Sequence, residues 1–300
     1  MITTLSYCRK WGWLCLVFLI NSSWIPPSYS DALVRYPRPM SSEDKRTDYP
    51  IQLLRMALAA SDGHYRVAAS ELSMSQGRAL LNLEHGQSVD VVWTMTSQQR
   101  EFALRPVRIP IYKGLIGWRL LLIRKQDQQR YMALASVPEL KAIAAIQGHD
   151  WPDTTILQAN GYRVQRGTDY GGMFDMLVRG RGGYFPRSIA EIWQEQKVHS
   201  PKGLVVESSI LLHYPTAFYY FVNVDNKQLA KDLETGLERL IVRGDYDRLF
   251  RSTFDSIIRR AELQQRRAIE LHNPTLPVGT PLSRRELWEK PPRGLSIDVD

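Results

Sequence analysis

Segments with the pattern of strands alternate with segments of helical spacing along most of this 300-residue chain. Strand-like runs at 32–37, 65–72 and 89–95 are separated by helical runs at 49–61 and 75–87. In the helical runs, apolar residues recur every three or four positions. Because two strands joined by a helix lie parallel in one sheet, this order predicts an α/β fold with crossover helices.

A second series of the same kind begins after residue 116. Extended segments near 114–124 and 214–224 join it to the first series. The helical segment 226–243, after the second crossing, can then pack with the first series again. The order therefore predicts two α/β lobes, two crossover strands and a central cleft. In the second series, three strand-like runs each lead into a helical run: 140–148 into 151–161, 162–167 into 169–180, and 182–188 into 188–198.

These segments also predict the limits of the lobes. We expect lobe 1 to contain residues 31–116 and 222–258, and lobe 2 to contain residues 117–221. Residues 259–300 are charged and hold five prolines, so we interpret them as a Pro-rich C-terminal extension on lobe 1. A cleft between two α/β lobes is a common place for a small ligand, and we expect the binding site there.

The N-terminal thirty residues have the layout of a secretory signal peptide. Arg9 and Lys10 precede an apolar run of about ten residues, 11–20, and small residues stand at Ser28 and Ser30. The run is short for a bilayer span. We therefore expect residues 1–30 to be removed and the protein to be periplasmic; the alternative is an uncleaved N-terminal anchor.

Composition excludes several kinds of chemistry for the exported part. Cys8 and Cys15 both lie in the signal peptide, so we expect no disulfide, no thiolate metal site and no cofactor. The six histidines are spread out, and none pairs with another at metal-ligand spacing. Net charge falls from +8 to +6 without Arg9 and Lys10, which suits anionic ligands, whereas the scattered basic residues do not form a nucleic-acid motif.

Four segments carry a resemblance to a known family: "YPIQLLRMALAA", "HGQSVDVVWTMTSQQRE", "IPIYKGLIGWRLLLIRK" and "NKQLAKDLETGLERLIVRGDYDRLF". Their order resembles the extracellular solute-binding proteins of the polar-amino-acid type (family 3), the periplasmic substrate-binding proteins of ABC transporters. The resemblance covers about residues 31–255. It implies a periplasmic-binding-protein-like fold (type II), a monomer, and capture of a small polar solute for a membrane permease.

The resemblance also implies a role for Arg100, whose planar guanidinium would pair with a ligand carboxylate. The interval from either Thr94 or Thr96 to Arg100 differs from that of the family by one residue. The alternative is a helix-start arginine that pairs with Glu101.

A second departure concerns the strand end "GGYFPRS". The family places an aspartate there to hold the ligand's ammonium group, whereas this chain has Arg187. An arginine attracts a carboxylate or phosphate and repels an ammonium group. We therefore expect an anionic solute, with Tyr184 and Arg187 in contact with it. The alternative for Arg187 is an ion pair with a residue such as Glu191.

Further candidates stand at the ends of other strands, where open α/β sheets bind ligands. Thr94 and Thr96 have hydroxyls for a ligand, although either can cap the next helix. Trp93 forms a stacking wall or belongs to the core. His149 lies on a turn before a helix start, or is simply solvated there, and Tyr36 ends the first strand.

The sequence has no nucleophile elbow, no "HExxH" and no phosphate-binding "GK[ST]" motif, so we expect no enzyme. Two binding functions remain open. In the first, the protein delivers its solute to an ABC-type permease. In the second, the same fold is a periplasmic sensor or accessory module that acts through a protein partner.

Overall fold

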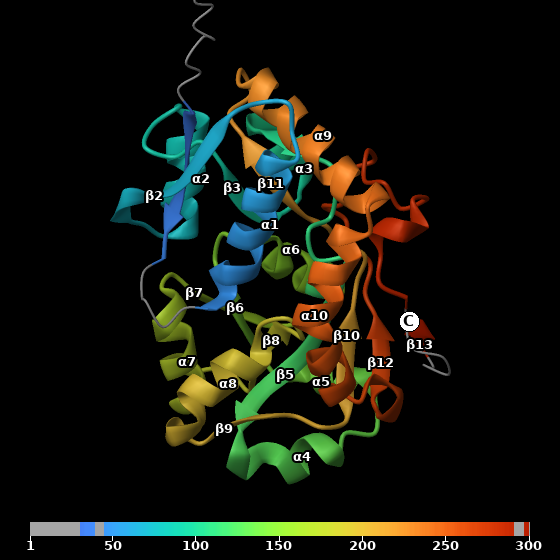
Figure 1. Cartoon of the computed structure of the whole chain (residues 1–300). Coiled ribbons are helices and arrows are strands. Elements are labelled where there is room, and N and C mark those ends of the chain that lie inside the picture. The colour runs from blue at the N-terminus through green and yellow to red at the C-terminus, as the bar shows by residue number, and fades with distance from the viewer. Residues whose placement is uncertain (1–30, 40–44, 291–296, 300) are drawn as a thin grey trace, which may run out of the picture. The chain divides into compact units, whose positions relative to one another are not determined.

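The computed structural model describes residues 31–39, 45–290 and 297–299, drawn in colour in Figure 1. The predicted signal peptide lies outside these residues. Across the described part, the elements follow the predicted α/β order. Some helices begin where the sequence provides a side-chain cap. At the start of α2 (Gln76–Glu84), the Ser75 side chain accepts from the Arg78 amide, and Gly86, with φ +65°, follows the end of the helix.

Lobe 1 is built on two small sheets that are joined through the backbone. In one, β1 (Ala32–Arg38) lies parallel to β2 (Tyr65–Ser73). In the other, β11 (Phe218–Val222) lies between β3 (Val92–Met95) and β4 (Arg105–Val107), antiparallel to both. The amides of Asp90 and Val91 donate to the Arg35 carbonyl, which places β1 beside the start of β3.

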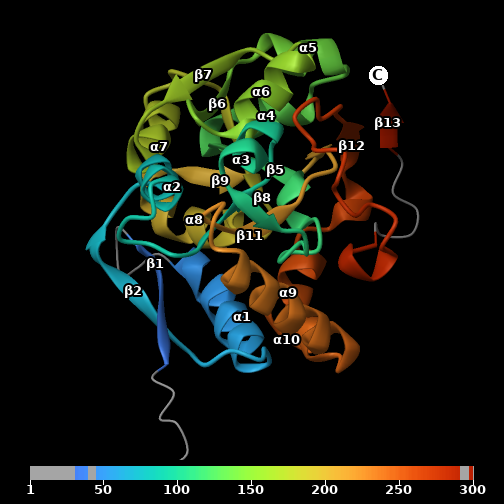
Figure 2. The same cartoon turned by 90° about the horizontal axis from the view of Figure 1, so that it is seen from above.

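Helices cover these sheets. Beside α2, the lobe contains α1 (Asp48–Ala59), α3 (Gln98–Ala103) and α9 (Lys227–Val242). Figure 2 shows α1, α9 and α10 (Asp245–Arg260) side by side, in agreement with their contacts. The contact between α1 and α9 requires Gly236, because a Cβ there would lie 1.8 Å from the Ala57 carbonyl oxygen.

Lobe 2 is built on one larger sheet, with strand order β13-β12-β10-β5-β8-β6-β7, and β9 also pairs with β5. Its strands are β5 (Trp118–Arg124), β6 (Ala145–Gly148), β7 (Val164–Gly167), β8 (Tyr184–Ser188), β9 (Leu204–Val206), β10 (Ile210–His213), β12 (Arg267–Glu270) and β13 (Ile297–Val299). Its helices are α4 (Gln128–Met132), α5 (Val137–Ala142), α6 (Pro152–Ala159), α7 (Tyr170–Val178) and α8 (Ile192–His199).

The central strand β5 is buried from residue 118 to residue 123. Five of these six residues are apolar, which is typical of a strand that is covered on both faces. The sixth is Arg119, which is 3% exposed and therefore needs a partner inside the lobe.

Strand β8 differs from its prediction, because it continues through Pro186 to Ser188. Strand β8 pairs with β6 only between Ala145 and Tyr184. Pro186 has no N–H, and its absence therefore costs no hydrogen bond on the edge of β8 that faces β6.

Two segments connect the lobes and run side by side. Trp118 pairs with His213, and the Tyr214 amide donates to the Gly117 carbonyl. The second crossing is complete before β11, whose pairing with β3 and β4 puts residues 218–221 in lobe 1, whereas the sequence placed them in lobe 2.

The C-terminal extension contacts both lobes, whereas we predicted contact with lobe 1 alone. Strand β12 pairs in parallel with β10 of the larger sheet (Figure 1). The chain then returns to lobe 1: the Gln98 amide donates to the Thr275 carbonyl, and the Glu289 amide donates to the Lys113 carbonyl. The extension is therefore a third connection between the lobes, and the residues that the structure describes form one compact unit.

No helix of the described part is both long and apolar enough to cross a membrane.

We expect Gly117→Ala to destabilise the protein by about 1–3 kcal/mol, because the new Cβ would lie 2.1 Å from the Tyr214 carbonyl oxygen and push the two crossings apart. Gly171→Ala is the control, because its Cβ would meet nothing closer than 3.5 Å and alanine favours the helix by up to about 1 kcal/mol. Urea denaturation measures both. Equal stability of the two variants would contradict the tight crossing.

Candidate functional site

A cavity of about 460 Å³ lies between the two lobes. Lobe 1 contributes residues that follow β1, residues at the start of α2, and two residues of β3. Lobe 2 contributes residues that follow β6 and β7, and one face of α8. Strands β6 and β7 are parallel, and both end at this cavity, with Gly148 and Gly167 in its wall. The cavity therefore lies where parallel α/β sheets bind ligands.

Aromatic rings form part of the wall. Trp93 lies against Tyr36, with 5.9 Å between ring centroids, so the lobe 1 wall is held from behind by the end of β1. From lobe 2, Trp151 stacks on Phe185 at 6.3 Å, and Tyr170 stands at the start of α7. These rings offer flat, apolar surface with few free rotations.

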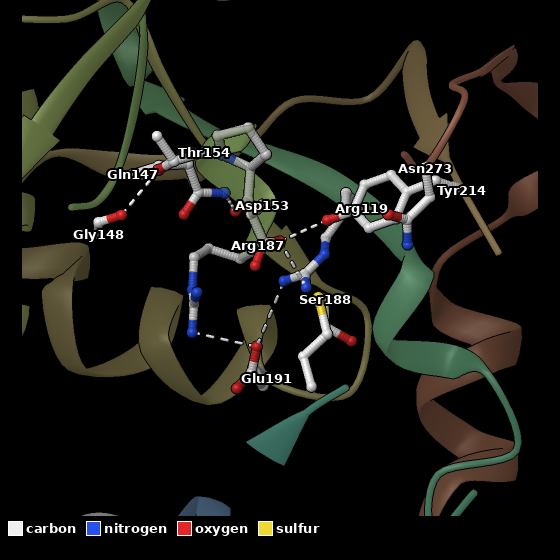
Figure 3. Close-up of polar contacts among 12 residues, drawn as sticks. Arg119, Gln147, Gly148, Asp153, Thr154, Arg187, Ser188, Glu191, Tyr214 and Asn273 are labelled. Carbon is white, nitrogen blue, oxygen red and sulfur yellow. Dashed lines mark hydrogen bonds and ion pairs between the residues drawn. The ribbon is translucent and has the colours of Figure 1, made fainter. Parts of the chain in front are cut away.

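A network of buried charges in lobe 2, which we call the floor, reaches the cavity wall through Glu195. Figure 3 shows the ion pairs of Arg119 and Arg187 with Asp153 and Glu191. Arg187 is 2% exposed, and its Nη2 lies 2.6 Å from Glu195 Oε1 and 3.1 Å from Glu191 Oε2. Arg119 pairs with Asp153 at 2.7 Å and lies 3.8 Å from Glu191. Glu195 is the member that also lines the cavity.

The network keeps Arg187 and Glu195 ionised inside the lobe. Burial opposes the charged form of Arg187, but Glu191 and Glu195 hold the pKa of its guanidinium well above the usual value. Burial likewise opposes the carboxylate of Glu195, but Arg187 and then Arg46 hold its pKa below the usual range. The Tyr170 hydroxyl donates to Glu195 Oε1 at 2.7 Å. Each buried charge thus has a partner, as burial requires.

Arg100 lies beside the cavity and crosses to the other lobe. Its Nη1 donates to Thr94 Oγ1 and to the Met95 carbonyl, both at 2.8 Å, and its Nη2 reaches the Asp150 carbonyl at 3.3 Å. Burial lowers the pKa of Arg100 to about 10, against the opposing charge of Asp150, so the group is still a cation at neutral pH. Its donors are directed at protein oxygens, and its side chain is not part of the wall.

Two of the predicted site residues line the cavity, namely Trp93 and His149. Tyr36 supports Trp93 from behind. The His149 amide donates to the Gly167 carbonyl, which holds the turn after β6 against the end of β7.

The other predicted contacts need correction. Thr94 is buried and accepts from Arg100, while Thr96 is buried and donates to Glu101 at 2.6 Å. Tyr184 lies in the core against Tyr131, because its position in β8 points to the opposite face from Arg187. Arg187 forms ion pairs with Glu191 and Glu195. The alternative that we gave for Arg187, an ion pair with a residue such as Glu191, is therefore the one that the structure has, with Glu195 as a second partner.

The wall also contains charged residues beside the predicted ones. They are Arg46, Asp150, Asp169 and Glu195, together with Arg38 at the end of β1. Two signals were readable: Glu191 and Glu195 are four residues apart, the spacing of one helix face, and Arg38 stands at the end of a strand. Arg46 had no such signal, because its position depends on how the lobes meet. Among the described residues, no group of three metal-ligating side chains is present.

Two lobes, two adjacent crossings and a cavity at the strand ends define a two-lobed, periplasmic-binding-protein-like fold. No protein-family model and no curated protein sequence matches the chain. Solved structures do match, and they confirm the fold that the resemblance predicted.

Three of these structures have TM-scores of 0.55–0.57. An ancestral arginine-binding protein bound to glutamine is 15% identical, with 75% of this chain and 99% of that chain covered and a TM-score of 0.57. An arginine-specific periplasmic binding protein from Salmonella typhimurium is 15% identical, with 74% and 99% covered and a TM-score of 0.55. A histidine kinase sensor domain similar to periplasmic binding proteins is 16% identical, with 75% and 96% covered and a TM-score of 0.56.

We expect Glu195→Gln to lower the free energy of unfolding at pH 7 by about 3–5 kcal/mol, because Arg187 loses part of its buried compensation. Since the folded pKa of Glu195 lies below 4.5, its contribution is present above the unfolded pKa and is lost as the pH falls through the folded pKa. Urea titrations between pH 7 and pH 3 should therefore show a smaller loss of stability in acid for the variant. Asp175→Asn, which removes an exposed pair with Lys202, is the control and should change little.

Proposed function

We propose that this protein is a periplasmic solute-binding protein that captures a small polar solute with an anionic group and delivers it to an ABC-type permease. The observation that carries the proposal is the cavity of about 460 Å³ at the strand ends of both lobes. That volume is in the range of small-molecule sites. We propose that the protein binds its solute without catalysing a reaction, and that it acts as a monomer.

Two arginines in the wall support a solute with an anionic group, although Arg100 and Arg187, which first suggested one, are bound to protein groups. Arg38 and Arg46 line the cavity from lobe 1. Of the carboxylates, Glu195 already accepts from Arg187 and Tyr170, and Asp169 accepts from the Gly172 amide at 2.6 Å as the cap of α7. Arginine donors are well suited to carboxylate and phosphate.

The second candidate function is a sensor or accessory module that acts through a protein partner. It is favoured by the sensor domain among the similar structures and by the extension that connects the lobes. A permease gene beside this one would support transport, whereas a neighbouring kinase or cyclase gene would support signalling.

A thermal-shift screen of the purified protein against amino acids, organic acids and phosphates tests the proposal. A solute at about 100 times its dissociation constant adds about 2.7 kcal/mol of stability, and we expect the hits to be anionic. A screen whose only hits are cations would contradict the proposed solute class.

We expect Arg38→Ala to weaken binding of an anionic hit at least tenfold, or about 1.4 kcal/mol, as measured by isothermal titration. Arg105→Ala is the matched control, because Arg105 donates to the Val224 carbonyl at 3.0 and 2.9 Å and is outside the cavity wall. Equal affinities of the two variants would remove Arg38 from the site.

A further inference from the structure

Arg46 spans the cleft from one lobe to the other. It belongs to a short 3-10 helix, Lys45–Thr47, directly before α1 of lobe 1. Its guanidinium carbon lies 4.0 Å from the centroid of the Tyr170 ring, on α7 of lobe 2. This distance is well inside the range of a cation–π interaction. Both residues line the cavity, so the contact lies within the proposed binding site.

The floor of the cavity has one negative charge more than it has positive charges. Arg119 and Arg187 supply two cations, and Asp153, Glu191 and Glu195 supply three carboxylates. His199 does not restore the balance at neutral pH, because burial and then Lys202 lower the pKa of its imidazole.

Of these three carboxylates, Glu195 is the one that lines the cavity, although it is only 3% exposed. Arg46 is one of the positive charges that act on the Glu195 carboxylate. With Arg46 included, the network has three cations and three carboxylates. A buried carboxylate without such compensation is costly, so this place on the floor requires a cation.

We propose that Arg46 is an internal cation that fills the place where the cleft would otherwise bind a cationic group of a ligand, and that it thereby selects against guanidinium and ammonium ligands. This inference rests on the proposed function, because it concerns the same cavity. It explains how the Glu195 carboxylate in the wall coexists with an anionic solute, because the cation that acts on Glu195 already belongs to the protein.

The test is whether removal of Arg46 opens a cation site. We expect Arg46→Ala to bind methylguanidinium or L-arginine at least tenfold more tightly than the unmodified protein, as measured by isothermal titration. The aromatic face of Tyr170 and the Glu195 carboxylate would hold the probe. Arg46→Lys keeps the positive charge and should gain no affinity.

Arg38→Ala is the matched control, since it removes another arginine of the same wall without the contact to Tyr170. If Arg46→Ala gains no affinity, or if Arg38→Ala gains as much, the proposal is overturned. Arg46→Gln, which keeps the length of the side chain without its charge, replaces Arg46→Ala if thermal melting shows that the alanine variant is unfolded.

The outcome is separate from that of the proposed function. If the unmodified protein binds no solute but Arg46→Ala gains the cation site, the role of Arg46 is supported and solute capture fails. If the unmodified protein binds an anion but Arg46→Ala gains nothing, solute capture is supported and the role of Arg46 fails.

Discussion

The buried ion pairs of lobe 2 are the interactions on which the rest of the site depends. Arg119 is the second residue of β5, in a buried stretch that is otherwise apolar, and Arg187 stands near the end of the neighbouring strand β8. Neither can be buried without a carboxylate, so α6 and α8 must pack where Asp153, Glu191 and Glu195 meet them. The network fixes the second lobe's helices against its sheet and gives the cavity a charged floor.

The same network connects the floor with the crossings. On the second crossing, the Tyr214 hydroxyl donates a hydrogen bond to Asp153. Asp153 in turn forms an ion pair with Arg119 of β5, the strand that follows the first crossing. At the opposite end, Glu195 faces the cavity and binds Tyr170. A chain of hydrogen bonds and ion pairs therefore runs from the point where the lobes join to the point where a solute would lie. The C-terminal extension adds a third connection outside this chain.

Most of the element order could be read from the sequence, because local periodicity decides it. The alternation of strands and helices and the long helix α9 both depend on residues within one or two turns. Strand β12 was missed, since its short, charged segment forms a strand only against β10. Long-range pairing overrides local preference in such a segment.

What the sequence by itself determined is the α/β class, the two lobes and the strand ends at which Trp93 and His149 stand. Only the tertiary structure decided which charges face the cavity. Arg100 and Arg187, the obvious candidates, are bound by partners four or more residues away in sequence, one of them in the other lobe. Arg46 reaches the cavity only because the lobes meet. The sequence determines which side chains are charged. Whether such a side chain is free to bind a ligand depends on the partners that it contacts after folding.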